Sequence, residues 1–397
     1  MEDTMNRKVV ITSAVRTPIG SMGGSLSDTP VTDLGSHVIR GAIDKSNITP
    51  DLVDEVFMGC VFQAGQGQNV ARQAAMKAGV PFHKPATTIN VLCGSGLQTV
   101  NMAAKFIAAG HSEIIVAGGM ENMSASPYLL PKARYGYRLG SGEIVDSMIK
   151  DGLEDAFNDY HMGVTAENIA EKWELSREEL DQFVFTSQSN AVRAIEEKKF
   201  VEEILPFEIK TKRANHLFSE DESIRKDTTL EKLGKLRPVF MKDGKVTAGN
   251  SSGISDGAAA VLLMSEEKAI EMDIPILAYW EAGELAGVEP SIMGIGPVDS
   301  TRKVLSKTGL TIDDIELVEL NEAFAAQSIA VIRELGLRQE LVNVNGGAIA
   351  LGHPLGASGC RILVSLIHEM IRRDTRIGLA ALCVGGGMGC STIIRRD

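Results

Sequence analysis

Two cysteines and one histidine of this chain lie in glycine-rich segments that follow apolar, strand-like runs. Cys93 lies in the segment 91–96 (VLCGSG), His353 in the segment 352–359 (GHPLGASG) and Cys383 in the segment 382–389 (LCVGGGMG). Glycine lets backbone amides approach a ligand closely at such turns. A thiolate is the nucleophile that attacks a thioester, and an imidazole can take a thiol proton near neutral pH. These residues therefore predict nucleophilic acyl-transfer chemistry.

Each of these residues has a functional and an ordinary structural explanation. In the functional explanation, Cys93 precedes a helix that we expect from Ser95, and the amides at a helix start lower a thiol pKa from about 8.5 toward neutrality. Most free cysteines, however, simply fill space in a core, and that alternative applies to Cys93 and Cys383 alike. His353 could pack at its turn before a proline, and Asn321, which follows an apolar run, could cap the next helix.

An internal repeat provides the elements that would position these residues. The segments 53–60 and 315–321 are acidic lead-ins to short strands, and predicted helices follow at 71–78 and 327–335. Strands are then expected at 88–91 and 341–345, each leading into a glycine turn and a helix. Both units close with an apolar strand and a Gly-Gly-Met. The alternative is a chance similarity between two generic βαβα runs.

Two features of the repeat predict how it folds. Apolar residues at 97, 100, 104 and 107 fall on one face of the first helix, and Gly110 is a natural end for it. The closing strands lack polar alternation, which is typical of strands covered by helices on both faces. We expect two such halves to pack into a layered sandwich whose equivalent strand ends face one another.

The segment 122–246 differs from the repeat in its composition and in its predicted secondary structure. Charged residues are dense, strands are sparse, and Ser176 with Glu179 has the spacing of a capping box that opens a helix. We interpret this segment as an inserted, mostly helical region.

Bulk composition excludes several classes of protein. The chain has 397 residues, a formal net charge of −12 and five cysteines. The negative charge argues against a nucleic-acid surface, and the odd cysteine count favours a reducing compartment over a disulfide framework. No paired Cys and His spacing indicates a structural zinc site, and no apolar run of 18 residues indicates a membrane span. The first eight residues are too polar for a signal peptide, so we expect a cytosolic protein.

Taken together, the segments around Cys93, Asn321, His353 and Cys383 resemble the thiolase family over nearly the whole chain. The resemblance implies an α/β fold, a layered αβαβα sandwich of two pseudo-symmetric halves. Residues 1–121 and 247–272 would form the N-terminal half and 273–397 the C-terminal half. The inserted residues 122–246 would form a loop domain that covers coenzyme A and contributes to tetramer contacts.

The same resemblance assigns chemical roles. Cys93 would be the acyl-accepting nucleophile, activated by His353, and Cys383 would exchange the Cα proton of the second acetyl-CoA. Asn321 would hold a water that, with His353, stabilises the enolate oxygen. The backbone N–H groups of Cys93 and Gly385 would form a second oxyanion site. Preorganised donors of this kind are what an enolate needs.

The resemblance also implies where coenzyme A binds. Arg225 matches an arginine near the nucleotide, and it lies in the segment 210–237, which has eight Lys or Arg against five Asp or Glu. A solvated face is the alternative for these lysines, and the contact of Lys232 is left open. The His-Met-Gly at 161–163 resembles short-chain members, with Met162 and Met293 narrowing the acyl pocket. The substrate-binding residues that we expect are Leu153, His161, Met162, Arg225, Phe240, Ala248, Ser252, Gly253, Met293, Ala323 and Phe324.

The activity implied by the resemblance is that of the acetyl-CoA C-acetyltransferase branch: condensation of two acetyl-CoA to acetoacetyl-CoA and CoA, and the reverse thiolysis. We expect no metal and no cofactor beyond the coenzyme A thioesters that are substrates, no nucleic-acid or membrane partner, and a homotetramer. Cys360 and Cys390, where smaller or aliphatic residues are more usual, should only fill space. The rivals are a degradative 3-ketoacyl-CoA thiolase of broader chain length, a β-ketoacyl-carrier-protein synthase and a non-catalytic acyl-CoA-binding protein.

Overall fold

The computed structural model describes residues 7–210 and 215–397, and a large mixed sheet forms its centre. The hydrogen-bonded strand order is β14-β15-β16-β13-β1-β12-β5-β3-β4. β1 and β13 pair only over Val9–Ile11, so the sheet divides there into two parts. The N-terminal part comprises β1 (Val9–Arg16), β12 (Ser255–Ser265), β5 (Ile114–Asn122), β3 (Glu55–Gly59) and β4 (Ala86–Ile89), with β2 (Gly20–Ser21) beside β12. The C-terminal part comprises β13 (Ala278–Gly287), β16 (Met388–Arg395), β15 (Ile377–Val384) and β14 (Leu317–Leu320).

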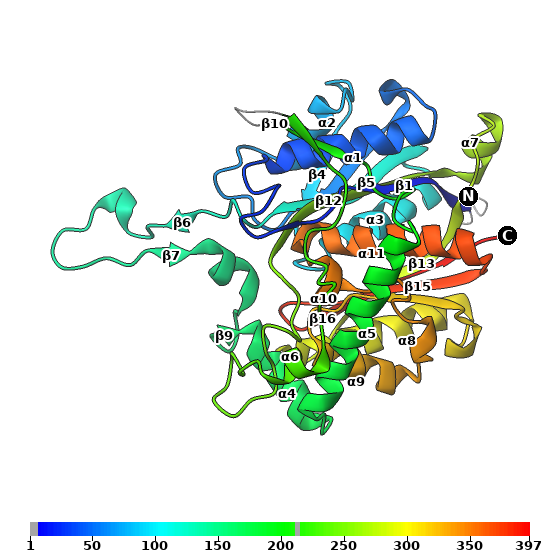
Figure 1. Ribbon diagram of the computed structural model, residues 1–397. Coiled ribbons are helices and arrows are strands. Elements are labelled where there is room, and N and C mark those ends of the chain that lie inside the picture. Colours follow the sequence, from blue (N-terminus) through cyan, green and yellow to red (C-terminus); the bar gives the residue numbers. More distant parts are fainter. Residues whose placement is uncertain (1–6, 211–214) are drawn as a thin grey trace.

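Helices form three layers around the two parts of the sheet (Figure 1). α3 (Ser95–Ala108) and α11 (Leu355–Arg373) lie in the middle and contact strands of both parts. α1 (Val31–Lys45) and α2 (Val70–Lys77) cover the N-terminal part, while α8 (Gly296–Thr308) and α9 (Ala325–Leu335) lie on the opposite side of the molecule. The predicted αβαβα sandwich is therefore confirmed.

The two middle helices cross at glycines. A Cβ on Gly96 would lie 2.9 Å from the Gly356 carbonyl oxygen, and one on Gly359 would lie 2.4 Å from the Leu97 nitrogen. Any larger side chain would push α3 and α11 apart, so these glycines serve close packing. Both helices start at this crossing, which brings the segments that hold Cys93 and His353 together.

The repeat is present, with two differences from its predicted form. β3 pairs in parallel with β4 and β5, but the strand expected at 341–345 does not form. Asn343 instead adopts a φ of 48°, and its side chain bonds the Leu320 N–H and carbonyl, replacing a strand pairing. The two Gly-Gly-Met segments also differ: the first lies within β5, whereas Gly386 and Gly387 form the β15–β16 turn with φ of 79° and 82°.

The inserted segment is more varied than the sequence indicated. Its helices are α4 (Met162–Lys172), α5 (Arg177–Glu196) and α6 (Leu230–Gly234), and the capping box at Ser176 is present. Three short antiparallel pairs were not predicted: β6–β7 (Tyr128–Leu129, Val145–Asp146), β8–β9 (Glu154–Asp155, Tyr160–His161) and β10–β11 (Phe207–Lys210, Asn215–Phe218). β6 and β7 form the base of an arm that projects far from the body (Figure 1). Part of the basic segment, residues 211–214, and the first six residues lie outside the described chain.

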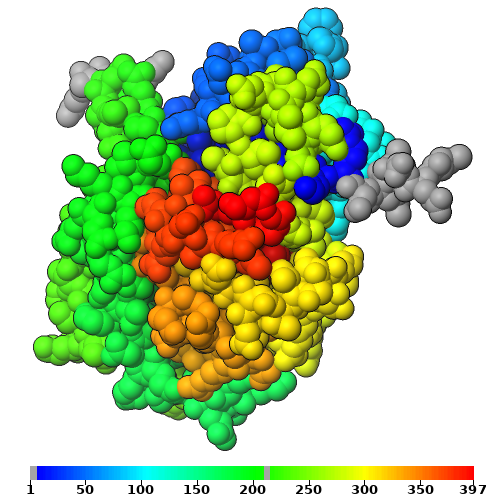
Figure 2. All heavy atoms as spheres, turned by 90° about the vertical axis from the view of Figure 1, so that its right-hand side faces the viewer, coloured from blue at the N-terminus to red at the C-terminus, as the bar shows by residue number. Residues whose placement is uncertain are grey.

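The ends of the two halves meet on one face of the molecule. Figure 2 shows the last residues of the chain (red) between α7 (Glu266–Glu271, yellow-green) and the yellow and orange segments of the C-terminal half. Within residues 7–210 and 215–397, no helix has both the length and the apolarity to cross a bilayer. The same part of the chain contains no cluster of His, Cys, Asp or Glu side chains suited to a metal ion.

Candidate active site

Cys93 sits in a tight turn between β4 and α3. Leu92 before it has a φ of 44°, which is unusual for a residue with a side chain. The Ser95 hydroxyl accepts from the Val91 N–H at 2.8 Å and donates to the Leu92 carbonyl at 2.6 Å, which holds the turn. Cys93 is 9% exposed, and it lines a cavity of about 400 Å³.

The predicted lowering of the Cys93 pKa is wrong. Burial raises the pKa of this thiol to about 11, although the N–H groups of Gly385 and of Cys93 itself act in the opposite direction. Desolvation of the thiolate outweighs the amides at the start of α3. The resting thiol is therefore protonated at neutral pH and needs a base in order to react.

His353 has the form of such a base. Its Nδ1 lies 2.6 Å from the Ser358 hydroxyl oxygen, and Ser358 lies 2.8 Å from the Pro354 carbonyl oxygen. Since a carbonyl only accepts, Ser358 donates to Pro354 and accepts the proton of Nδ1. Burial, followed by the positive charge of Arg361, lowers the pKa of His353 to about 3. The imidazole is neutral and carries no proton on Nε2, so this nitrogen can act as the base.

Asn321 and Cys383 lie behind the cavity wall, fully buried. The backbone N–H of Asn321 donates to the Ala381 carbonyl at 2.9 Å. The side-chain nitrogen Nδ2 of Asn321 lies 3.4 Å from His353 Nε2. Phe324, not Asn321, is the N-cap of α9, so the helix-capping alternative is excluded. Burial, and then the nearby Cys93, raise the pKa of the Cys383 thiol well above its ordinary value.

The cavity gathers most of the residues that the sequence singled out. Cys93, His353 and Gly385 line it together with residues of the inserted segment and of the loops after β14 and before β12. The Ser252 N–H donates to the Ala323 carbonyl at 2.9 Å, which ties these two loops together. The expected substrate-binding residues that line it are Leu153, His161, Met162, Phe240, Ala248, Ser252, Gly253, Met293, Ala323 and Phe324. Lining residues that the sequence did not indicate are Gly152, Val239, Ser251, Ile254 and Leu355.

A stack of rings forms one wall of the cavity. The His161 and Phe240 rings are stacked with centroids 4.7 Å apart, and Phe324 meets Phe240 edge-on at 6.3 Å. His161 Nδ1 accepts from the Gly163 N–H at 3.0 Å, and a Cβ on Gly163 would lie 2.3 Å from Phe240. Burial lowers the pKa of His161. The wall is thus neutral and closely packed.

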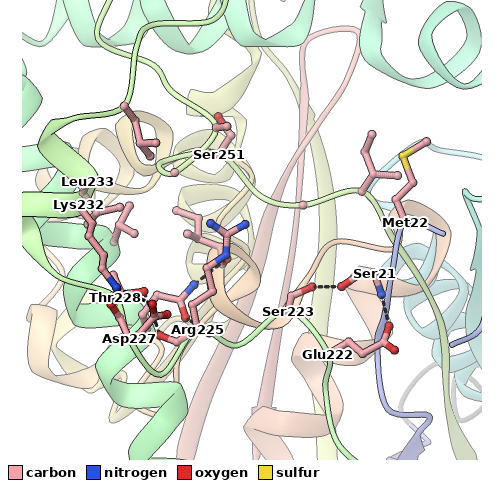
Figure 3. A pocket seen from close by; sticks show the side chains of 18 residues that line it. Ser21, Met22, Glu222, Ser223, Arg225, Asp227, Thr228, Lys232, Leu233 and Ser251 are labelled. Atoms are coloured by element: carbon pink, nitrogen blue, oxygen red, sulfur yellow. Dashed lines mark hydrogen bonds and ion pairs between the residues drawn. The ribbon is translucent and has the colours of Figure 1, made fainter. Parts of the chain in front are cut away.

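Arg225 lies apart from Cys93, in a second cavity of about 490 Å³ (Figure 3). The two cavities adjoin, since they share the lining residues Ala248, Ser251, Gly253 and Ile254, and we refer to them together as the groove. The Arg225 N–H donates to Gln188 Oε1 at 2.9 Å, while its side chain points into the cavity. Among the described residues, its guanidinium has no ion-pair partner within 4 Å.

Lys232, whose contact the sequence left open, is held by a neighbour. Its Nζ lies 2.5 Å from Asp227 Oδ2 and also donates to the Asp227 carbonyl at 2.8 Å. This pairing leaves Arg225 as the better candidate for an anion in this part of the groove.

Three residues that hold the site were not found from the sequence. Glu121 accepts the N–H groups of Val61, Phe62 and Gly356, and burial raises its pKa to about 7. The other two are Ser358, described above, and Arg361. Buried ionisable residues such as Glu121 and Arg361 are uncommon, and nothing in their local pattern marks them. Ser358 lies within the segment 352–359, but its contact with His353 could not be read from the sequence. Cys360 and Cys390 are buried free thiols within the core cluster.

Comparisons with known proteins agree with this geometry. The family model described as the N-terminal domain of thiolase matches residues 9–267, and that of the C-terminal domain matches residues 274–396. Acetyl-CoA acetyltransferases of Pseudomonas aeruginosa and Chromobacterium violaceum are 55% and 54% identical over 390 residues. Each alignment covers 98% of this chain and, respectively, 99% and 100% of the relative.

Solved structures give the same result. The acetyl-CoA acetyltransferase of Bacillus anthracis superposes with a TM-score of 0.97 at 47% identity, covering 99% of this chain and 100% of that one. Human mitochondrial 3-ketoacyl-CoA thiolase superposes with a TM-score of 0.96 at 43% identity, covering 98% and 99%. The chain belongs to the thiolase family.

Proposed function

We propose that this protein is an acetyl-CoA C-acetyltransferase that condenses two acetyl-CoA to acetoacetyl-CoA and CoA, and catalyses the reverse thiolysis. The observation that carries the proposal is the convergence of Cys93, the neutral His353 and the Gly385 backbone on one cavity. The names of the relatives, at up to 55% identity over nearly the full chain, support this choice of substrate.

In the first half-reaction Cys93 attacks the acetyl-CoA thioester, and His353 Nε2 takes the thiol proton. The N–H groups of Cys93 and Gly385 face the Cys93 sulfur, where they would meet the oxyanion of the tetrahedral intermediate. Collapse of the intermediate leaves acetyl-Cys93 and the thiolate of CoA. Because burial keeps Cys383 protonated, Cys383 can give its proton to that thiolate and become the base that the second step needs.

In the second half-reaction the Cys383 thiolate removes the Cα proton of another acetyl-CoA. The enolate oxygen would be stabilised by His353, now protonated on Nε2, and by a water on Asn321. Carbon–carbon bond formation with acetyl-Cys93 gives acetoacetyl-CoA and releases Cys93 as a thiolate, to which His353 returns its proton. Two successive half-reactions of this kind give ping-pong kinetics.

The groove has the two chemical characters that coenzyme A requires. Its inner cavity is apolar and suits the pantetheine and acetyl groups, with Ser252 and Gly253 along the pantetheine. Its outer cavity carries the free guanidinium of Arg225, which suits a phosphate of the nucleotide. Local charge rather than the net charge of −12 would then decide binding.

A 3-ketoacyl-CoA thiolase of broader chain length is the second candidate, favoured by the likeness to the human mitochondrial enzyme. Against it, Met162 and Met293 are 7% and 3% exposed and close the inner cavity together with Phe240. Thiolysis rates for 3-ketoacyl-CoA of increasing chain length distinguish the two. We expect a steep loss beyond acetoacetyl-CoA, and a flat profile would favour the second candidate.

We propose a homotetramer, as the family resemblance implies, and the projecting arm supports a contact between copies of the chain. This segment exposes large apolar side chains: Tyr128 (66%), Leu130 (52%), Tyr135 (87%), Leu139 (99%) and Ile144 (68%). Exposed apolar groups gathered on one extension are typical of a contact with another copy. The mass in solution tests it, with Leu139→Ser together with Tyr135→Ser expected to reduce the oligomer. We also propose a reducing compartment, the cytosol, which the five free cysteines support.

Mass spectrometry after exposure to acetyl-CoA is the decisive experiment. We expect one acetyl group per chain, located on Cys93 by digestion. Failure to form any acetyl-enzyme would favour a non-catalytic acyl-CoA-binding protein instead.

A further inference from the structure

Arg361 is a buried arginine directly behind the candidate site. It lies on α11, is 1% exposed and does not line the cavity. Its Nη2 donates to Asn321 Oδ1 at 3.4 Å, and its Nη1 lies 3.6 Å from Glu319 Oε2. Among the residues that the structure describes, its Nε and Nη1 have no hydrogen-bond partner. A guanidinium buried with incomplete pairing destabilises a fold, so its presence here needs a functional explanation.

The hydrogen bonds that start at Arg361 can run in only one direction. A guanidinium only donates, so the Asn321 carbonyl oxygen faces it and the Asn321 NH₂ faces His353 Nε2. Nε2 is then an acceptor, and the proton of the neutral ring is on Nδ1, which donates to Ser358. Ser358 in turn donates to the Pro354 carbonyl, which only accepts. The two ends therefore fix the orientation of every group between them.

Removal of the guanidinium would free the Asn321 side chain to turn over. Its carbonyl oxygen would then face His353 Nε2 and favour a proton on that nitrogen, and the Ser358 hydroxyl, which can rotate, would turn from the Pro354 carbonyl to donate to Nδ1. An imidazole in this tautomer cannot take the proton of Cys93. The turned amide would also present no donor for a water at the enolate oxygen.

Pairing with the negative charge of Glu319 does not by itself explain why Arg361 is buried here. Burial raises the pKa of Glu319 to about 8, so this carboxyl is largely protonated near neutral pH. The contact of Arg361 with Asn321 connects it instead to the reacting groups.

We propose that Arg361 is a positioning residue that fixes the amide orientation of Asn321 and, through it, the tautomer of His353. The kinetic consequence rests on the proposed function, whereas the orientation of the two side chains does not. Arg361 acts through its neighbours and touches no substrate.

Three variants separate orientation from charge balance. Arg361→Gln combined with Glu319→Gln replaces both groups of the buried contact by neutral amides of similar size, so neither is left facing an absent partner and the chain should fold. Glutamine can accept as well as donate, whereas the ammonium of Arg361→Lys only donates. Glu319→Gln alone is the matched control.

For thiolysis of acetoacetyl-CoA we expect the double variant to lose about 10²-fold in kcat, with the KM for CoA unchanged within about twofold. Arg361→Lys should keep most of the activity, and Glu319→Gln should stay close to the unchanged protein. Wild-type kcat per folded molecule in the double variant would overturn the proposal. An equal loss in Arg361→Lys would overturn it as well.

Nitrogen NMR of protein with isotope-labelled histidine provides a readout that does not require turnover. The His353 signals are identified by their absence in His353→Asn. We expect a proton on Nδ1 in the unchanged protein and both tautomers in the double variant. A proton on Nε2 in the unchanged protein would overturn the proposal. If the tautomers are as expected but acetoacetyl-CoA is not cleaved, the proposed function fails and the positioning role stands.

Discussion

The inner and outer ends of the groove are built in opposite ways. At the inner end Cys93, His353, Asn321 and Cys383 are buried and are held by segments that follow strands or precede the central helices. At the outer end Arg225 and Asp227 are exposed and lie on a loop of the inserted segment, with the exposed Lys232 of α6 beside them (Figure 3). The difference is one of solvation as well as position.

Solvation decides what each end can do. Burial keeps the thiols and the imidazole neutral at the inner end, so charge develops there only as protons move during the reaction. The charges at the outer end are permanent but screened by water and salt, so each contributes modestly to binding. We therefore expect inner-end variants to change rate constants and outer-end variants to change affinity.

The largest effect should come from Cys93→Ser. A hydroxyl is a far weaker nucleophile than a thiolate, so acetyl-enzyme formation should disappear and thiolysis should fall at least about 10⁴-fold. Mass spectrometry and initial rates measure both, with the melting temperature as a control for folding. Acetylation of Cys383 in the unchanged protein would reverse the assignment of the two cysteines.

A smaller and more selective effect is expected for Cys383→Ala. The variant should still form acetyl-Cys93, because the nucleophile and His353 remain. It should lose condensation and the exchange of the acetyl-CoA Cα protons by at least about 10²-fold, because the base is absent. Proton exchange in deuterated water, measured by NMR, checks this. Undiminished exchange would show that another group takes the proton.

At the outer end, Arg225→Ala should raise the KM for acetoacetyl-CoA about tenfold with little change in kcat. A truncated pantetheine thioester, which has no nucleotide, should show no such change. Lys232→Ala is the matched control, because Asp227 already holds that lysine; its KM should change less than about threefold. Equal losses with both substrates would place Arg225 elsewhere in the mechanism.

The smallest effect concerns stability against pH. The pKa of His353 is about 3 in the folded protein and about 6.5 when unfolded, so the unfolded chain binds this proton first on acidification. The stability that the neutral ring provides is therefore complete above about pH 6.5 and declines as the pH falls toward 3, by about 1.4 kcal/mol per pH unit.

Denaturant unfolding between pH 7 and about 5 tests this expectation. The free energy of unfolding should decline less steeply for His353→Asn than for the unchanged protein, while Arg225→Ala should decline in parallel with it. Buried acids such as Glu121 have a raised pKa, so their contribution to stability changes with pH in the opposite direction to that of His353. This contribution is the same in all three proteins and does not affect the comparison. Parallel curves for His353→Asn would contradict the low pKa of His353.

The sequence predicted what depends on local pattern. The spacing of apolar residues located α3, unbroken apolar runs located β5 and β15, and the glycine segments marked the turns at Cys93 and His353. These predictions hold because apolar periodicity and glycine turns depend on residues that are close together in the sequence. The strand expected at 341–345 failed because the Asn343 side chain takes over its pairing, a contact between residues 23 positions apart.

Tertiary structure alone decided the protonation of the site and the residues that hold it. Whether the helix start lowers the Cys93 pKa or burial raises it depends on how closely other segments cover the thiol. Arg361 and Glu121 resemble ordinary charged residues in the sequence, which are usually exposed. Only the packing of α11 between two parts of the sheet buries them beside Asn321 and Gly356, because burial sums contacts from the whole chain.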